Sequence, residues 1–237
     1  MLKKPAVTYK VFLFERVKKK ALFLNTETYP LQIRLTAGTK TIYIKSYFFS
    51  LLRLKKYQQE MQKKDAPYRL QEIARLEDEL IAYLLIQKTN GSLPGLRHQY
   101  VHFSYDLLHH LDESFKQFLV DFFYTEQLPA YAMFIKNDGA NHRAEFILSN
   151  LEQSLQPVVF KKLLTRAAAS APPYIPLACF FQKMIKDSLP VLPVYRWKKD
   201  SLAIAFSLFT RQYFPEYKAV APAEYIQQLI EKTAFIG

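Results

Sequence analysis

The sequence predicts an α+β protein in which a small three-stranded antiparallel sheet precedes a larger, all-helical region. Its first 50 residues contain short segments rich in β-branched and aromatic residues, which favour strands. Most of the remainder shows apolar residues at helical spacing, interrupted by proline-containing segments. The chain has 237 residues and is 50% hydrophobic, so it can bury a substantial core. We expect a basic sheet domain at residues 1–57, a helical connector at 58–92 and a helical domain at 93–237.

Three strands are expected in the sheet domain, at residues 8–16, 29–37 and 40–49, and AGTK would form the hairpin turn between the last two. Alternate residues of a strand face opposite sides. The apolar side chains of the second and third strands should therefore share one face: Leu31, Ile33, Leu35, Ile42 and Ile44. The other face would carry Gln32, Arg34, Tyr43 and Lys45. Lys10 lies on the same side of the first strand as Phe12, and either orientation of that strand fits. Residues 17–28 either extend it or form a basic loop.

Six further helices are expected after a helix at about 68–88. Their approximate ranges are 103–125, 142–155, 158–170, 177–189, 200–213 and 222–233. Asp200 would be the N-cap of the fifth of these, and Pro222 suits the first turn of the last. Phe115 and Leu119 lie at helical spacing and are expected in the core.

Positive charge is concentrated towards the N-terminal end. The net charge is +12, from 33 Lys and Arg against 21 Asp and Glu. Residues 1–75 hold 17 of the basic and 5 of the acidic residues, so the remaining chain is balanced at 16 each. Such asymmetry points to a nucleic acid or another anionic partner. A basic run such as VKKKA also occurs in proteins where it serves only to keep the chain in solution.

The stretch YPLQIRLTAGTKTIYIKSYFF, which follows a lysine-rich link and precedes a charged helix, resembles a known domain. This is the arm-type DNA-binding domain of tyrosine recombinases, the phage integrase-like proteins, especially those of Bacteroidetes mobile elements. The resemblance covers roughly the first 55 residues and implies a sheet that enters the major groove of DNA. It would direct Arg34, Tyr43 and Lys45 to DNA and the run from Lys18 to Lys20 to phosphates. The expected DNA-binding residues are Lys10, Lys18, Lys19, Lys20, Arg34, Lys40, Tyr43 and Lys45.

The catalytic residues of tyrosine recombinases are not found. That family needs two arginines, basic and histidine residues between them, and a tyrosine nucleophile near the C-terminus. RHQYVHF comes too early in the chain, and FTRQYF offers Arg211 and Tyr213 without a preceding histidine box. We therefore expect a non-catalytic DNA-binding protein, an accessory or regulatory factor of a mobile element, that needs no cofactor.

The segment around Trp197 resembles the C-terminal part of regulators of conjugative-transposon excision, in which a tryptophan precedes two helices in a helix-turn-helix-like arrangement. A DNA-reading helix usually begins with basic or amide side chains. PAEYIQQ offers Glu224, Gln227 and Gln228 instead. The shortage of positive charge favours a helical pair that closes a core.

Two other features of the sequence bear on a possible site. A single helix through residues 97–110 would align His98, His102, Asp106 and His109 or His110, and imidazoles at this spacing can bind a transition metal. A third ligand would have to come from elsewhere and HExxH is absent, so a surface or core-edge helix face is favoured. The only cysteine, Cys179, cannot form an internal disulfide and is expected to be a buried thiol.

Double-stranded DNA is the expected partner. RNA or single-stranded DNA remains open, because aromatic residues interleaved with basic ones can stack on bases. The competing hypothesis is a protein-interaction module whose basic end binds an acidic partner, and an oligomer is open too. No apolar run reaches the roughly 18 residues of a membrane span and no signal peptide is evident, so we expect a cytoplasmic protein without membrane contact.

Overall fold

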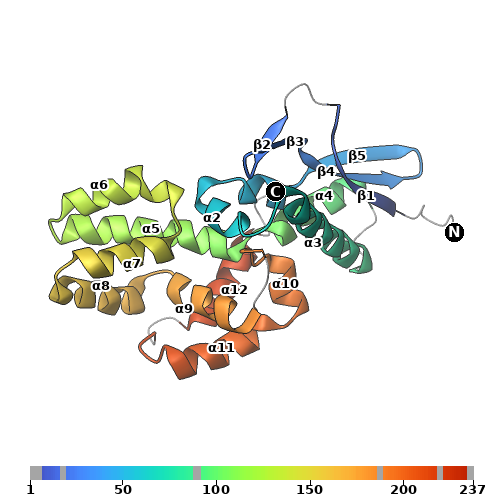
Figure 1. The fold of residues 1–237 in the computed structure, drawn as a ribbon. Coiled ribbons are helices and arrows are strands. Elements are labelled where there is room, and N and C mark those ends of the chain that lie inside the picture. The colour runs from blue at the N-terminus through green and yellow to red at the C-terminus, as the bar shows by residue number, and fades with distance from the viewer. Residues whose placement is uncertain (1–6, 17–19, 88–91, 186–188, 218–220, 234–237) are drawn as a thin grey trace. The chain divides into compact units, whose positions relative to one another are not determined.

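The computed structural model describes residues 7–16, 20–87, 92–185, 189–217 and 221–233, and it confirms an α+β fold with a small antiparallel sheet followed by helices (Figure 1). The chain divides into two compact units between Tyr105 and Asp106. The expected boundaries at 57/58 and 92/93 therefore lie inside the first unit. Among the described residues, no helix is long and apolar enough to cross a membrane.

The described residues of the first unit, unit 1, form two small sheets and four α-helices. Strand β1 (Val7–Leu13) pairs with β4 (Leu31–Ala37), which pairs with β5 (Lys40–Lys45), and all neighbours are antiparallel. The expected strands are thus present but shorter than predicted: β1 ends at Leu13, β4 begins at Leu31 and β5 ends at Lys45. The other elements of unit 1 are β2 (Ala21–Phe23), β3 (Thr26–Thr28), α1 (Tyr47–Leu52), a 3-10 turn (Lys55–Tyr57), α2 (Gln58–Met61), α3 (Ala66–Ile86) and α4 (Leu93–Ser104).

The link after β1 folds into a hairpin of its own, in which β2 pairs with β3. Leu24 and Asn25 turn the chain with φ values of 48° and 61°. Two successive residues with positive φ are typical of the tight turns whose twist matches paired strands. Sequence patterning left this link open between a strand extension and a loop.

Helices α3 and α4 cover one face of the three-stranded sheet (Figure 1). They belong to unit 1 because the apolar side chains of that face need a partner layer. Leu31, Ile33 and Leu35 are at most 4% exposed, as their alternation predicts. The expected connector and the start of the expected helical domain provide this layer, which explains why the chain divides at residue 105.

A buried polar cluster joins the three main helices of unit 1. Ser46 caps α1, since its Oγ accepts a hydrogen bond from the Phe49 amide, and the same hydroxyl donates to Glu77 Oε1 at 2.5 Å. The Tyr100 hydroxyl of α4 donates to the Glu77 carboxyl group and accepts from the amide of Tyr47 at 2.9 Å. A carboxyl group on α3 is thus tied to both α1 and α4.

All the regular elements among the described residues of the second unit, unit 2, are helical. Its elements are α5 (Leu107–Thr125), α6 (Pro129–Asn137), a 3-10 turn (Gly139–Asn141), α7 (Ala144–Ser154), α8 (Pro157–Ser170), α9 (Tyr174–Phe180) with a π-helical turn (Phe181–Ile185), α10 (Val194–Lys199), α11 (Leu202–Tyr213) and α12 (Pro222–Thr233). Phe115 and Leu119 of α5 are fully buried, as expected. Helix α6 was not expected from the sequence.

The helix expected at residues 103–125 is wrong at its start, because Asp106 separates α4 from α5. One oxygen of the Asp106 carboxylate accepts from the amide of His109 and caps α5. The other accepts from the amide of Leu192 at 2.5 Å. Two backbone donors therefore hold this aspartate outside any helix.

Of the two predictions for the C-terminal helices, the start of α12 is confirmed and the N-cap of α11 is wrong. Helix α12 begins at Pro222, as predicted. Asp200 does not cap α11: it ends α10, and Ser201 precedes α11 with a left-handed φ of 51°.

Candidate nucleic-acid interface

The face of the sheet that α3 and α4 leave open carries basic and aromatic side chains in register. Lys10 on β1 lies opposite Arg34 on β4, and Arg34 lies opposite Tyr43 on β5. Their side chains therefore form one row across the three strands. The next row consists of Phe12, Gln32 and Lys45. We call these six residues, together with Phe14, the open sheet face.

The charge of the open sheet face is of one sign. Lys10, Arg34 and Lys45 are exposed, and β1, β4 and β5 contain no Asp or Glu. Within the described residues, none of these three cations forms an ion pair. Some other basic residues of unit 1 do pair with a carboxylate, such as the buried Arg69 with the partly buried Glu72 at 2.7 Å. The open sheet face is therefore a cationic surface available to a partner.

Aromatic rings gather beside these cations. The rings of Phe12 and Tyr43 lie with their centroids 6.4 Å apart, and Phe14 lies 6.2 Å from Phe12 and 6.5 Å from Tyr43. The Tyr43 side chain is 52% exposed. Sequence reasoning anticipated Tyr43 but missed Phe12 and Phe14, because either orientation of β1 fitted the pattern. The cross-strand register provides the missing information.

Three of the other expected DNA-binding residues lie away from this face or outside the described residues. Lys40 is exposed at the hairpin end of β5, but it alternates with the side of Ile42 and Ile44 rather than with that of Tyr43. Lys18 and Lys19 fall outside the described residues.

The last expected residue, Lys20, is exposed at the start of the β2–β3 hairpin and forms an ion pair with Glu27 at 3.4 Å. Both side chains are well exposed, and such surface pairs contribute only about 0–1 kcal/mol. The pair would therefore not prevent Lys20 from contacting a phosphate.

The histidines do not form the single-helix arrangement considered above. His98 and His102 lie on α4 in unit 1, whereas His109 and His110 lie on α5 in unit 2. Burial lowers the pKa of His110, which favours its neutral form. No group of three potential metal ligands occurs within the described parts of the chain.

Cys179 is half-buried, and burial raises the pKa of its thiol. A raised pKa lowers the fraction of reactive thiolate at neutral pH. This environment fits the structural role expected from the sequence and not that of an activated nucleophile.

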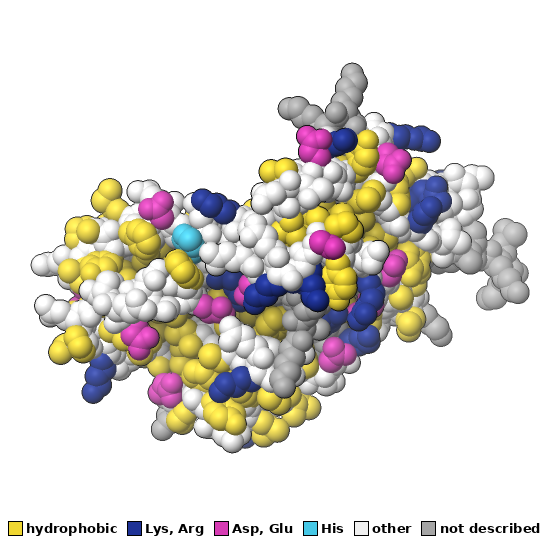
Figure 2. Space-filling model, in the orientation of Figure 1, with side chains coloured by type: hydrophobic (Ala, Val, Ile, Leu, Met, Phe, Trp, Pro, Cys, Tyr) yellow, Lys and Arg dark blue, Asp and Glu magenta, His cyan; other side chains and the backbone are white. Residues whose placement is uncertain are grey.

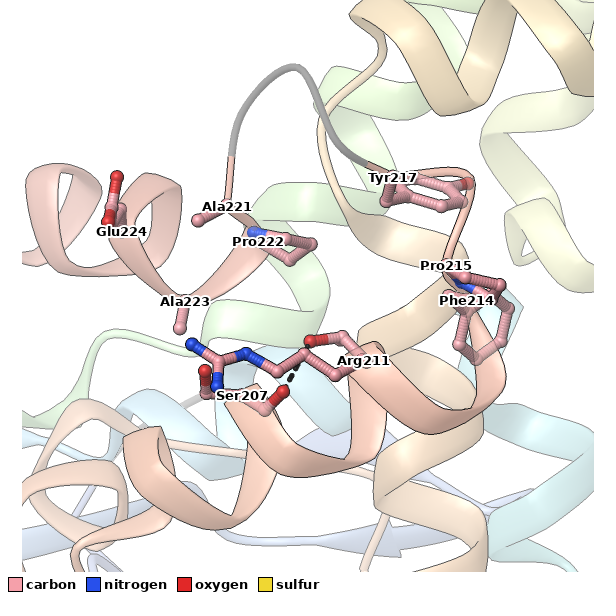
Figure 3. Close-up of a pocket in the computed structure, with 10 residues that line it drawn as sticks. Ser207, Arg211, Phe214, Pro215, Tyr217, Ala221, Pro222, Ala223 and Glu224 are labelled. Atoms are coloured by element: carbon pink, nitrogen blue, oxygen red, sulfur yellow. Dashed lines mark hydrogen bonds between the residues drawn. The ribbon is translucent and has the colours of Figure 1, made fainter.

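A pocket of about 420 Å³ lies between α11 and α12 (Figure 3). Figure 3 shows Arg211 extending from α11 towards Ala223 in the first turn of α12, while Glu224 points away from it. Gln227, on the next turn, donates to Glu231 at 2.8 Å. Two cations, Arg211 and Lys232, are offset on these helices by two carboxylates, Glu224 and Glu231, so the pair lacks the cationic surface found on the sheet.

An apolar surface lies at the α6–α8 end of unit 2, where hydrophobic side chains gather in Figure 2. It includes a pocket of about 300 Å³ between α6 and α7, lined in part by Tyr131 and Phe134. The exposed apolar side chains on these helices are Met133, Phe134, Phe146, Val158 and Leu164. Exposed apolar surface of this kind is suited to contact with another protein.

No protein-family model, curated protein or solved structure matches this chain.

Proposed function

We propose that this protein binds DNA without catalysing a reaction on it, and that the open sheet face is the contact surface. The observation that carries the proposal is the row formed by Lys10, Arg34 and Tyr43 on three strands that contain no acidic residue. Exposed cations on one face, without an ion pair among the described residues, match the charge of a phosphate backbone.

In this proposal the outer strands contact phosphates and the central strand contacts bases. Outer strands of a three-stranded sheet lie roughly 9–10 Å apart, since neighbouring strands are about 4.8 Å apart. Lys10 on β1 and Lys45 on β5 would then contact phosphates on either side of the central strand. Arg34 on β4 lies between them, where its planar guanidinium can donate two hydrogen bonds to a guanine edge. Duplex DNA is the partner that the sequence favours, with the sheet in its major groove.

The resemblance of the first 55 residues to recombinase arm domains supports an accessory or regulatory role in a mobile element. A non-catalytic role fits the absence of the recombinase constellation from the sequence. The apolar surface on α6–α8 would serve contact with a second copy or with another protein.

Fluorescence anisotropy with the full-length protein tests the proposal. Labelled DNA, as a duplex and as its separate strands, is titrated over a salt series. We expect binding that weakens steeply with salt, and a log–log slope that falls by roughly 0.7–0.9 for each phosphate contact removed. The double variant Arg34→Glu/Lys45→Glu should abolish binding to every form of DNA that the unmodified protein binds.

The matched control is Lys161→Glu/Arg211→Glu, which makes the same change of charge on exposed residues of α8 and α11. It should leave most of the affinity intact. If both double variants lose the same amount of DNA affinity, the interaction depends on net charge alone. If only the control variant loses affinity, the interface lies on unit 2. If no DNA binds at low salt, the proposal is wrong and an acidic protein becomes the better candidate partner.

A further inference from the structure

The aromatic rings of the open sheet face differ from the other exposed tyrosines of the described chain. Tyr68, Tyr124 and Tyr213 each have a lysine ammonium group within 5.3 Å of the ring centroid. Tyr43 is exposed to a similar extent, but its ring contacts Phe12 and Phe14 and no cation. No cation therefore lies over the Tyr43 ring within the described residues.

The positions of Phe12 and Phe14 suit them to support the Tyr43 ring. Both side chains are partly buried, and the plane of Phe12 crosses that of Tyr43 at 69°. Such edge-to-face contacts hold an aromatic ring in a defined orientation. A ring that is fixed in advance loses little conformational entropy when a ligand stacks on it.

We propose that the open sheet face binds unpaired bases of DNA, one of which stacks on Tyr43, with Arg34 beside it and Lys10 and Lys45 on the adjoining phosphates. This inference rests on the proposed function and specifies its substrate as single-stranded DNA or a duplex with an unpaired segment. An unpaired segment takes the place of the intact duplex that the sequence favours, because of the aromatic rings on the open sheet face.

Intact duplex and unpaired DNA offer different surfaces to the aromatic rings, and this difference favours unpaired DNA as the ligand. In an intact duplex the bases are stacked on each other, so a protein in the groove meets only their edges, and an aromatic side chain gains little beyond contact with a thymine methyl group. An unpaired base offers its whole π-face to an aromatic ring or a guanidinium plane. Rings placed between cations, without a carboxylate on the same strands, provide both interactions that a single strand needs.

The first test uses anisotropy with the full-length protein and four labelled probes of matched length: a single-stranded DNA, the same strand with central abasic sites, the intact duplex, and a duplex with an unpaired central segment. We expect the single strand and the interrupted duplex to bind at least about tenfold more tightly than the intact duplex. Removing central bases while keeping every phosphate should weaken binding about 5- to 150-fold for each stacked base.

The second test uses variants. Tyr43→Leu and Phe12→Leu keep apolar bulk but remove the ring, and each should weaken single-strand binding while leaving thermal unfolding nearly unchanged. The matched control is Tyr68→Leu, which changes a tyrosine of similar exposure on α3 of unit 1. Photocrosslinking with a 5-iodouracil-containing single strand, followed by peptide mapping, should place the crosslink on Tyr43 or Phe12.

The outcomes separate this inference from the proposed function. If the intact duplex binds as tightly as the single strand, and abasic sites have no effect, the stacking site is wrong while DNA binding stands. Tighter binding of RNA of the same sequence would overturn the assignment to DNA. If none of the DNA probes binds, both proposals fall together.

Discussion

The Tyr100 hydroxyl lies 2.9 and 3.0 Å from the two carboxyl oxygens of Glu77, and both side chains are almost completely buried. Burial raises the pKa of Glu77 to about 7, although hydrogen bonds from Ser46 and Tyr100 oppose the rise. The helical layer beneath the open sheet face is therefore held together by a carboxyl group that titrates near neutral pH.

The stability of unit 1 should depend on the protonation of Glu77. Its pKa is higher in the folded state, at about 7, than its ordinary value of 4.5, so the folded state binds the proton more tightly. This contribution is fully present below about pH 4.5 and is lost as the pH rises through 7. The two pKa values correspond to about 3 kcal/mol, at about 1.36 kcal/mol per pH unit.

Glu77→Gln isolates this effect, because glutamine has nearly the same shape and does not titrate. Relative to the unmodified protein, the free energy of unfolding of the variant should rise by about 2–3 kcal/mol between pH 5 and pH 8. Urea denaturation followed by circular dichroism at both pH values measures it. A difference between the two proteins that is independent of pH would show that Glu77 does not titrate in this range.

Tyr100→Phe should destabilise unit 1 by about 2 kcal/mol, because it leaves a buried carboxyl oxygen and the amide of Tyr47 without their partner. Hydrogen exchange at the Tyr47 amide should accelerate in the same variant. Tyr68→Phe removes an exposed hydroxyl and is the control. Equal stability of the two variants would contradict the role assigned to the Tyr100 hydroxyl.

The sheet was predictable because strand alternation is a local property. Leu31, Ile33 and Leu35 alternate strictly, and the glycine-containing turn after them leaves one arrangement of the next strand. The first strand lacked this signal because Phe12 and Phe14 place apolar side chains on the face that stays open. The residues that made its orientation ambiguous are those that form the proposed stacking site.

The polar residues of the interior could not be predicted from their neighbours in the sequence. Glu77 sits in a helix where an acidic residue normally faces solvent, and its burial depends on Ser46 and Tyr100 from other helices. Asp106 looked like part of a continuous helix, yet its second backbone partner, Leu192, comes 86 positions later. Side chains whose partners are distant in the sequence leave no periodic pattern.

Unit 2 contains a buried ion pair whose loss should be costly. Lys116 Nζ lies 2.9 Å from Asp112 Oδ2, and Asp112 Oδ1 accepts from the amide of Ala144 at 2.6 Å. Asp112→Ala leaves the buried ammonium group of Lys116 with the half-exposed Glu113 as its remaining ion-pair partner among the described residues, and should cost about 3–5 kcal/mol.

Unfolding of unit 2 can be followed by the fluorescence of Trp197, the only tryptophan of the chain, which is 2% exposed. Asp112→Ala/Lys116→Met removes both charges and should recover a large part of the loss. A double variant as unstable as the single one would show that the cost comes from the unpaired amide of Ala144 and not from the buried charge.

Lys10 and Lys40 test whether the sheet geometry or the sequence better identifies the DNA-binding residues. Both were expected to contact DNA, but only Lys10 lies in register with Arg34 on the open sheet face, whereas Lys40 lies on the other side of β5 at the hairpin end. Lys10→Gln should weaken DNA binding severalfold at about 50 mM salt and lower the salt slope by roughly 0.7–0.9, as expected for one phosphate contact. Lys40→Gln removes the same charge and should change the slope by much less. The two lysines are comparable because both are exposed and neither forms an ion pair among the described residues. Equal effects of the two changes on DNA binding would mean that affinity depends on the charge of the whole unit and not on the geometry of the sheet.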